Sequence, residues 1–243
     1  MEVLGKIVGG AAGFAMGGPL GALVGAVAGH AVDHIRTVRT VEEPDLTRQG
    51  AFTIAVIALG AKMAKADGTV APIELDAVKE VFRVPPGEMR NFERVFDVAR
   101  RDAATFEPYA RQVARMFADQ PGVLEELLNA LFHIAKADRV AHPDEVAYLR
   151  QVAAIFGFDD PTFERLRAAH FGRDGMDPYA VLGVARDAPD VEVREAWRRL
   201  IRENHPDSLV AQGVPKEFVA LATDRVATIN VAYDQIRRQR AGK

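Results

Sequence analysis

Apolar residues recur at a spacing of three to four along nearly the whole chain, which is the period of an α-helix. The alternation of apolar and polar positions that marks a half-buried strand is scarce. An uncharged, glycine-rich start gives way to a long region of amphipathic segments and then to a region of strongly charged helices. We therefore predict an all-α protein made of an N-terminal segment (residues 1–36), a linker (37–46), a helical bundle (47–171) and a C-terminal helical hairpin (172–243).

The N-terminal segment has no charged residue between Lys6 and His30. As a helix, the stretch from Ile7 to Ala28 would be about 33 Å long, against about 30 Å for the hydrocarbon core of a bilayer. Glycine at every fourth position lets helices approach closely in a membrane. We predict a transmembrane helix, kinked at Gly18-Pro19, that forms a homodimer or larger oligomer through a glycine zipper. The zipper glycines are Gly5, Gly9, Gly13, Gly17, Gly21, Gly25 and Gly29.

A signal peptide and a flexible soluble tail are the alternatives to a membrane span. A signal peptide has a basic start and a shorter apolar core, whereas this chain begins Met1-Glu2-Val3. The soluble tail stays open, because glycine and alanine favour insertion only marginally. Lys6 precedes the segment, whereas Arg36 and Arg39 follow it. The positive-inside rule therefore predicts that the C-terminal regions lie in the cytoplasm.

The middle region contains an internal repeat of helix, acidic turn and helix. Residues 64–74 read Ala-Lys-Ala-Asp-Gly-Thr-Val-Ala-Pro-Ile-Glu, and residues 135–145 read Ala-Lys-Ala-Asp-Arg-Val-Ala-His-Pro-Asp-Glu. In each copy an aspartate ends one helix, and proline and glutamate fall in the first turn of the next, where both are favoured. Further helices are predicted near Phe52–Ala66, Glu88–Arg101, Phe106–Phe117, from Pro121 onward and near Pro161–Ala169.

Carboxylates of this repeat are candidate metal ligands, namely Asp67, Glu74, Asp138 and Glu145. Helix capping and solvated turns account for the same residues. Two carboxylates per turn are few for calcium, which takes about six to eight oxygen ligands. We expect no cofactor, with a divalent metal in the middle region as the alternative.

The C-terminal region predicts a short helix after Asp177-Pro178, a long helix to about Asn204, and a last helix from Pro215. The long helix has an apolar face of Val193, Ala196, Trp197, Leu200 and Ile201. Its opposite face is basic and carries Arg194, Arg198, Arg199 and Arg202. Proline disfavours the helical conformation in the residue before it, so His205-Pro206-Asp207 should end this helix. A loop of residues 208–214 follows. The result is an antiparallel hairpin with a charged tip.

Four motifs of this hairpin resemble a J-domain, the module by which DnaJ-type co-chaperones activate ATP hydrolysis by DnaK-type chaperones. They are Tyr179-x-x-Leu182-Gly183-Val184, Ala196-Trp197-Arg198-Arg199-Leu200, His205-Pro206-Asp207 and Ile229-Asn230-x-Ala232-Tyr233. The resemblance implies a DnaK-type partner whose acidic surface receives the arginine face, while the tripeptide biases the chaperone toward hydrolysis. The implied chaperone-binding residues are His205, Pro206, Asp207, Arg194, Arg198, Arg199 and Arg202.

The J-domain resemblance has two departures. Many J-domains place a basic-aromatic pair before the tripeptide and a lysine after it. In this chain Glu203-Asn204 and Ser208 occupy those positions.

Outside the hairpin, the acidic turns resemble the TerB family, named for tellurite resistance. The glycine-rich start and the long loop before Pro215 are similar to those of the DjlA-like membrane-anchored J-domain proteins. This resemblance implies a single-pass protein of the bacterial inner membrane with its C-terminal domains in the cytoplasm. It also implies that the TerB-like domain recruits a partner or senses stress.

Composition excludes several classes of partner and site. The net charge of −3 gives no case for nucleic acid, and the absence of cysteine excludes disulfides, thiolate zinc sites and cysteine nucleophiles. The chain shows no nucleophile–base pairing, phosphate loop or carboxylate dyad at recognisable spacing, so we expect a binding protein and no enzyme. Two other hypotheses stay open: a metal-dependent stress protein in which the hairpin is accessory, and a structural membrane oligomer.

Overall fold

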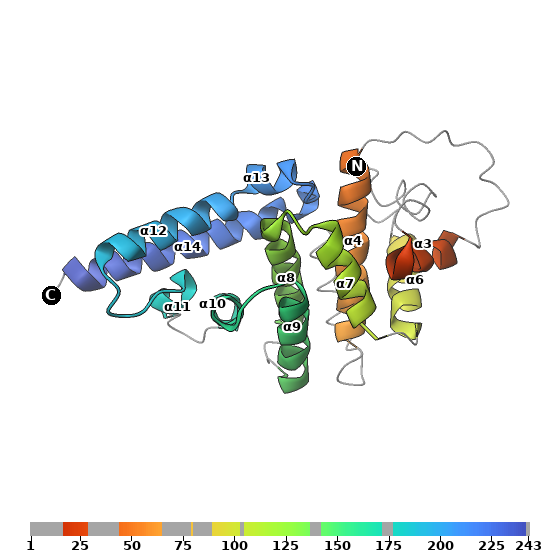
Figure 1. Ribbon diagram of the computed structural model, residues 1–243, viewed down its shortest axis with the longest axis horizontal. Helices are drawn as coiled ribbons and strands as arrows, with labels where there is room; N and C mark the ends of the chain where they lie inside the picture. The colour runs from red at the N-terminus through yellow and green to blue at the C-terminus, as the bar shows by residue number, and fades with distance from the viewer. Residues whose placement is uncertain are drawn as a thin grey trace.

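The computed structural model describes residues 17–28, 44–64, 79, 89–102, 105–136, 142–171 and 177–241. These residues form helices and turns, and no strand occurs among them, so the all-α prediction is confirmed. In chain order the helices are α3 (Gly18–Ala28), α4 (Pro44–Met63), α6 (Met89–Arg101), α7 (Glu107–Met116), α8 (Pro121–Ala135), α9 (Pro143–Ile155), α10 (Asp160–Phe171), α11 (Pro178–Leu182), α12 (Asp190–Glu203), α13 (Pro206–Ala211), the 3₁₀ turn η2 (Lys216–Phe218) and α14 (Val219–Ala241) (Figure 1).

Two apolar helices, α4 and α8, form the centre of a helical bundle. Every residue from Ala51 to Ala64 is buried, as is every residue from Val123 to Phe132. A helix that is apolar on all sides needs neighbours on all sides. Helix α4 packs against α6, α7 and α8, and α8 packs against α9 and α10. The result is one continuous apolar core under the middle region of the chain.

Helix α4 begins earlier than predicted. The sequence analysis assigned residues 37–46 to a linker, but the helix starts at Pro44. Proline is favoured at the first helical position, because the N–H that it lacks has no partner within the helix there. The linker prediction is therefore wrong for its last three residues.

The described part of the N-terminal segment is a helix that starts at Gly18. Gly17 and Gly18 both have left-handed φ angles, of +51° and +60°, so no helix runs unbroken through this point. The bend expected at Gly18-Pro19 is a helix start. Gln112 of α7 binds both sides of it, since its Oε1 accepts from the backbone N–H of Leu20 (3.0 Å) and its Nε2 donates to the carbonyl of Gly17 (2.9 Å).

Helix α3 packs on the bundle. It contacts α6, α7 and α4, and Leu20 and Leu23 are buried in the main core. Among the residues that the structure describes, no helix combines the length and apolar character needed to cross a bilayer.

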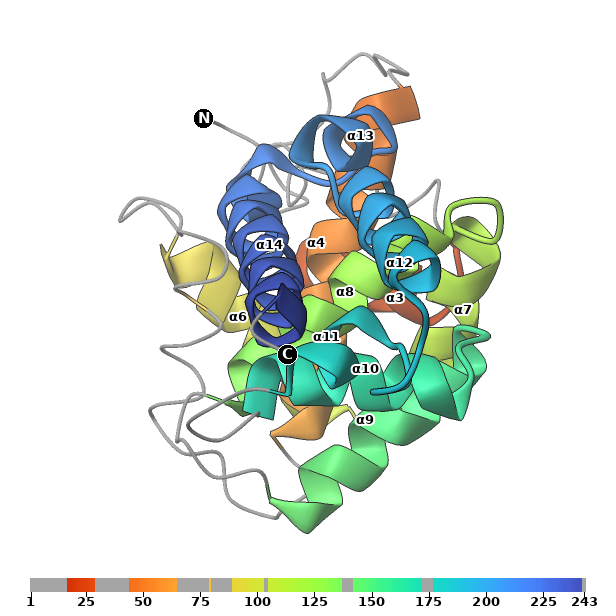
Figure 2. The ribbon, with the colours of Figure 1, turned by 90° about the vertical axis from the view of Figure 1, so that its left-hand side faces the viewer.

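The C-terminal hairpin is built from α12 and α14, which lie side by side and antiparallel (Figures 1 and 2). Trp197 of α12 stacks on Tyr233 of α14, with ring centroids 4.6 Å apart and planes 11° apart. The indole N–H of Trp197 also donates to Asn230 Oδ1 (2.9 Å). Helix α11 closes the hairpin, and the three helices share a second, smaller apolar core.

Candidate chaperone-binding surface

Helix α12 presents its basic face to solvent. Its apolar residues Val193, Ala196 and Leu200 are buried, and the acidic residues Asp190 and Glu192 lie in its first turn, where the helix dipole favours them. Arginines three or four positions apart then fall on the opposite side. All four predicted arginines are exposed, namely Arg194, Arg198, Arg199 and Arg202.

None of these four arginines makes an ion pair with another residue in the described ranges. Three of them line a shallow groove along α12, with Glu195, Trp197 and Ile201 between them. An unpaired row of guanidinium groups is suited to a carboxylate-bearing surface, because guanidinium and carboxylate form paired hydrogen bonds. The structure thus places the predicted arginines on one accessible face.

The tripeptide sits where α12 turns into α13. His205 has an extended backbone (φ −66°, ψ 126°), as proline requires of the residue before it. Its Nδ1 accepts a hydrogen bond from the backbone N–H of Asp207 (3.3 Å), so the imidazole caps α13. Pro206 occupies the first position of that helix. The three residues therefore form a helix start with fixed geometry.

Exposure differs within the tripeptide. The side chain of His205 is 53% exposed and that of Asp207 is 95% exposed. The Asp207 carboxylate bonds to no lysine or arginine of the described residues, and its Oδ2 lies 3.9 Å from His205 Nδ1. Its exposure leaves it accessible to hydrogen-bond donors of a partner.

The segment after the tripeptide is more ordered than predicted. The sequence analysis expected a loop over residues 208–214, but α13 occupies it up to Ala211. The His205 cap, the proline at the first position and the burial of Leu209 explain this helix. Gly213 then turns the chain with a φ of +100°.

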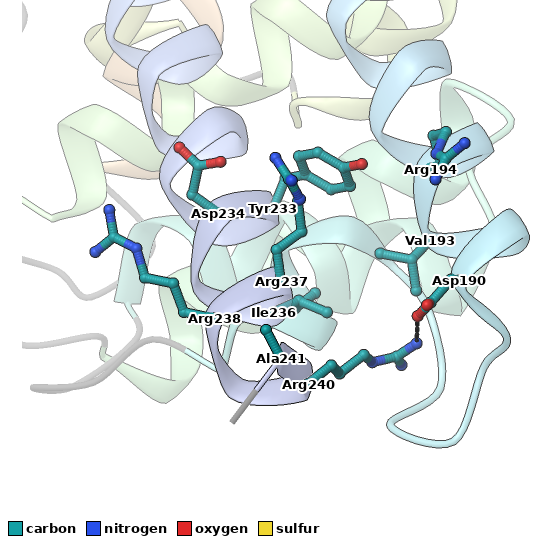
Figure 3. A pocket seen from close by; sticks show the side chains of 10 residues that line it. All are labelled: Asp190, Val193, Arg194, Tyr233, Asp234, Ile236, Arg237, Arg238, Arg240 and Ala241. Atoms are coloured by element: carbon teal, nitrogen blue, oxygen red, sulfur yellow. Dashed lines mark hydrogen bonds and ion pairs between the residues drawn. The ribbon is translucent and has the colours of Figure 1, made fainter. Parts of the chain in front are cut away.

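A second groove lies at the other end of the hairpin, between the start of α12 and the end of α14 (Figure 3). Figure 3 shows Arg240 reaching across to Asp190. Arg240 also donates to the hydroxyl of Tyr179 (3.2 Å) and to the carbonyl of Arg186 (3.3 Å). These contacts join α11, α12 and α14, which explains Arg240 as a structural residue far from the tripeptide.

Of the four predicted metal ligands, only Glu145 lies within the described residues; Asp67, Glu74 and Asp138 lie outside them. Glu145 is buried, and its Oε2 accepts from the backbone N–H of His142 (3.3 Å) at the start of α9. This contact is a helix cap. The described ranges contain no group of three or more His, Asp or Glu side chains placed to hold a metal ion.

The zipper glycines are only partly within the described ranges. Gly17, Gly21 and Gly25 are described, whereas Gly5, Gly9, Gly13 and Gly29 lie outside. Gly21 is buried where α3 meets the bundle. Their predicted role in oligomerisation stays a prediction.

A buried charge cluster behind the tripeptide was not predicted. Arg225 of α14 donates to Glu125 of α8 (3.2 Å), and Arg165 of α10 donates to the other oxygen of the same carboxylate (2.9 Å). A signal existed in the sequence, because Arg225 interrupts the apolar periodicity of α14, and Glu125-Glu126 stand between the leucines of α8.

Three known families match three successive parts of the chain, which correspond to the N-terminal segment, the bundle and the hairpin. Residues 1–51 match the family described as the transmembrane domain of the co-chaperone DjlA. Residues 53–168 match the tellurite resistance protein TerB family, and residues 177–240 match the DnaJ domain. No solved structure matches the chain.

Several similar proteins carry the name co-chaperone protein DjlA. The protein from Aliivibrio fischeri is 30% identical over the whole length of both chains. That from Photobacterium profundum is 29% identical over 81% of this chain and 80% of its own. That from Coxiella burnetii is 29% identical over 74% of each. With its exposed tripeptide, arginine face and three matching parts, the chain belongs to the DjlA family of J-domain co-chaperones.

Proposed function

We propose that this co-chaperone stimulates ATP hydrolysis by a DnaK-type chaperone through the tripeptide and the arginine face of α12. The observation that carries the proposal is the exposed Asp207 carboxylate at a proline-fixed helix start, beside a helix with four unpaired arginines. The names of the relatives support the same role.

The two charged features have different tasks in this mechanism. The arginines attract an acidic surface and set the orientation of the encounter, since complementary charges act mainly on association and on specificity. Asp207 then accepts hydrogen bonds from the chaperone at a position that Pro206 and the His205 cap have fixed. The hydrolysis itself belongs to the chaperone, and the chain catalyses no reaction.

The test is the ATPase rate of a DnaK-type chaperone with the purified full chain in detergent. We expect stimulation by the wild type and its loss in His205→Gln and Asp207→Asn. Asp224→Asn removes the same charge at an exposed position of α14 and should leave stimulation unchanged. Equal stimulation by Asp207→Asn and the wild type would refute the proposal.

We also propose that the N-terminal segment anchors the chain in the bacterial inner membrane, with the bundle and hairpin in the cytoplasm. The match of residues 1–51 to a transmembrane family supports this location. The excess of arginine after the segment supports the orientation. Carbonate extraction of membranes should leave the chain in the pellet, and a C-terminal reporter active only in the cytoplasm should be active.

Oligomerisation through the glycines that precede α3 is the third part of the proposal, because Gly21 is buried where α3 meets the bundle. A leucine in the glycine row blocks close helix approach in a membrane, whereas a leucine beside the row does not. Crosslinking of the full chain in membranes should therefore fall in Gly13→Leu and persist in Ala12→Leu. Equal crosslinking of the two variants would exclude the glycine zipper.

For the TerB-like bundle we propose a recruiting or stress-sensing role. Support comes from the match of residues 53–168 to the TerB family and from exposed residues of α7 and α9 such as Arg111 and Ala147. Photo-crosslinking from Arg111 and Ala147 in living cells should capture a protein other than the chaperone, and the adducts should change on heat shock. Capture of the chaperone alone would refute this role.

A further inference from the structure

The end of the hairpin that carries the tripeptide is buried against the bundle on one side. Leu209, Val214 and Phe218 are at most 1% exposed and belong to the same apolar core as α4 and α8. Phe218 meets Phe52 of α4 edge to face, with ring centroids 4.8 Å apart. The turn at Gly213 also lies against α4, because a Cβ added there would be 3.1 Å from Cβ of Arg48. Figures 1 and 2 both show this end of the hairpin next to the bundle.

Buried charges also pair between the hairpin and the bundle. The side chains of Glu125 and Arg225 are 10% and 9% exposed, and they pair across the interface between α8 and α14. Burial raises the pKa of Glu125, but Arg165 and Arg225 outweigh it and hold that pKa below its ordinary value. Removing Arg225 while the helices stay docked leaves Glu126 without its nearby cation and leaves Glu125 with Arg165 alone, which is unfavourable for buried carboxylates. The docked arrangement therefore depends on Arg225.

The departures from the usual J-domain motif fall on this same interface. Asn204 is buried, its side-chain N–H donates to the carbonyl of Leu200 (2.8 Å), and its proximity to Glu125 helps to lower the pKa of that carboxyl. The carbonyl of Glu203 would lie 3.3 Å from a Cβ added to Gly122 of α8. Ser208 accepts a hydrogen bond from Gln212 (2.9 Å). Gln212 in turn approaches Gly122. Of these three positions, Asn204 is buried, Glu203 meets the bundle through its backbone carbonyl, and Ser208 is linked to it through Gln212.

Docking nevertheless leaves the chaperone-facing groups open. Asp207 and the four arginines of α12 remain exposed while Leu209 and Phe218 are buried. The interface with the bundle thus covers Leu209 and Phe218 and leaves the proposed chaperone-binding side chains exposed.

We propose that the bundle is the docking partner of the J-domain tip within the same chain, and that α8 positions the tripeptide for the chaperone. Glu125, Arg225 and Gly122 are positioning residues, which act through the segment behind Asp207 and do not touch the chaperone. This inference rests on the proposed stimulation of a DnaK-type chaperone.

The experiment measures two quantities on the full chain in detergent. Hydrogen exchange of amides 209–218 reports docking, and the chain concentration that gives half-maximal ATPase stimulation reports positioning. Arg225→Ala breaks the charge pair, Arg225→Lys keeps the charge, and Gly122→Leu opens the interface by bulk alone. Arg238→Ala and Ala227→Leu make comparable changes at exposed positions of α14.

We expect exchange of amides 209–218 to be about a hundredfold faster in Arg225→Ala and Gly122→Leu, with a smaller change in Arg225→Lys. The half-maximal concentration should rise about tenfold in the first two, because only docked chains are competent. The exposed controls should match the wild type in both quantities. Should Arg225→Ala fail to fold, as judged by circular dichroism, Gly122→Leu and Arg225→Lys decide.

Unchanged exchange in these variants would overturn the docking interface. Faster exchange with an unchanged or lower half-maximal concentration would overturn the positioning role. A wild-type chain that gives no stimulation would overturn the proposed function and positioning together, while the exchange data would still decide whether the tip docks.

Discussion

At the scale of single residues, the tripeptide contains one side chain that builds the structure and one that does not. His205 caps α13, whereas the Asp207 carboxylate is almost fully exposed. Loss of a helix cap costs about 1 kcal/mol, and an exposed substitution away from such features stays within about 0.5 kcal/mol. Substitution of His205 should therefore lower both stability and activity, whereas substitution of Asp207 should lower activity with little loss of stability.

We expect His205→Ala to lower the free energy of unfolding by about 1 kcal/mol and Asp207→Ala to lower it by less than about 0.5 kcal/mol. Both variants should lose stimulation of the chaperone. Urea denaturation of the full chain, followed by circular dichroism, measures the first quantity. Equal stability of the two variants would contradict the capping role of His205.

Glu126 is a buried carboxyl of the same cluster, and its oxygens lack hydrogen-bond partners among the described residues. Its side chain is 1% exposed. The nearest opposite charge is Arg225 Nη1, 3.9 Å from Oε2. Burial raises the pKa of Glu126 to about 7; Arg225 opposes the rise and Glu125 adds to it. The folded chain therefore holds a proton there that the unfolded chain releases near pH 4.5.

A raised carboxyl pKa means that Glu126 costs nothing below about pH 4.5 and destabilises the fold progressively as pH rises to about 7. Glu126→Gln should therefore gain stability over the wild type as pH rises from 5 to 8, by up to about 3 kcal/mol. The measurement is the difference in unfolding free energy between the two chains at each pH. Using the difference cancels the titration of His170, whose pKa burial lowers well below its ordinary value. Parallel pH curves would exclude the effect.

Residue patterns predicted the exposed half of the site and missed the buried half. Four arginines at helical spacing and a proline-fixed tripeptide are local features, so the sequence alone places them on one helix and its end. Arg225 and Glu125 are separated by 100 positions, and local periodicity carries no information on which distant charges pair. The sequence showed only that each interrupts an apolar face.

At the scale of elements, Gly183 joins the start of the hairpin to the bundle. It ends α11 in the left-handed conformation (φ +66°). A Cβ added there would be 3.1 Å from Cδ of Arg165. That side chain cannot easily move away, because Arg165 is tied to Glu125. An added methyl group therefore meets both backbone strain and a fixed neighbour.

Gly157, which follows α9, is the matched control for this position. It also has a left-handed φ, of +88°, but an added Cβ would meet nothing within 4 Å. We expect Gly157→Ala to cost about 1 kcal/mol from strain alone and Gly183→Ala to cost about 2 kcal/mol. Thermal and urea unfolding of both variants measure the two losses. Equal losses would mean that Arg165 yields to the new methyl group.

Element boundaries were predictable where proline and apolar periodicity agree. The expected helices near residues 88–101 and 106–117 differ from α6 and α7 by one residue at most at each end, and α8 begins at Pro121 as predicted. Helix α13 was missed because six residues are too few to show a helical period. Its stability comes from the His205 cap and from Leu209, whose burial depends on the bundle.

At the scale of the whole molecule, the bundle and the hairpin tip share one core. Phe218 follows the J-domain tripeptide in sequence, yet it packs on Phe52 of the bundle. Deleting a buried phenylalanine costs about 3–5 kcal/mol. A shared core also makes the two regions unfold together.

We expect the wild-type bundle and hairpin to melt in a single calorimetric transition, and Phe218→Ala to split it into two. The hairpin transition of this variant should be destabilised by about 3–5 kcal/mol, the cost of deleting a buried phenylalanine. Val231→Ala, at an exposed position of α14, should leave one transition and a loss below about 0.5 kcal/mol. Two transitions in the wild type would contradict the shared core.

The contact between Phe218 and Phe52 also fixes where a chaperone bound at the tripeptide would lie relative to the bundle. A module on a flexible tether explores a volume set by the length of the tether, and its effective concentration is spread over that volume. Here Leu209, Val214 and Phe218 pack in one core with α4 and α8, so Asp207 has a fixed direction relative to the bundle. Under the proposed recruitment by the bundle, a chaperone engaged at Asp207 would meet the recruited protein at one distance and from one side. Client choice would then depend on geometry, since a segment bound on the far side of the bundle would be out of reach however tightly it binds.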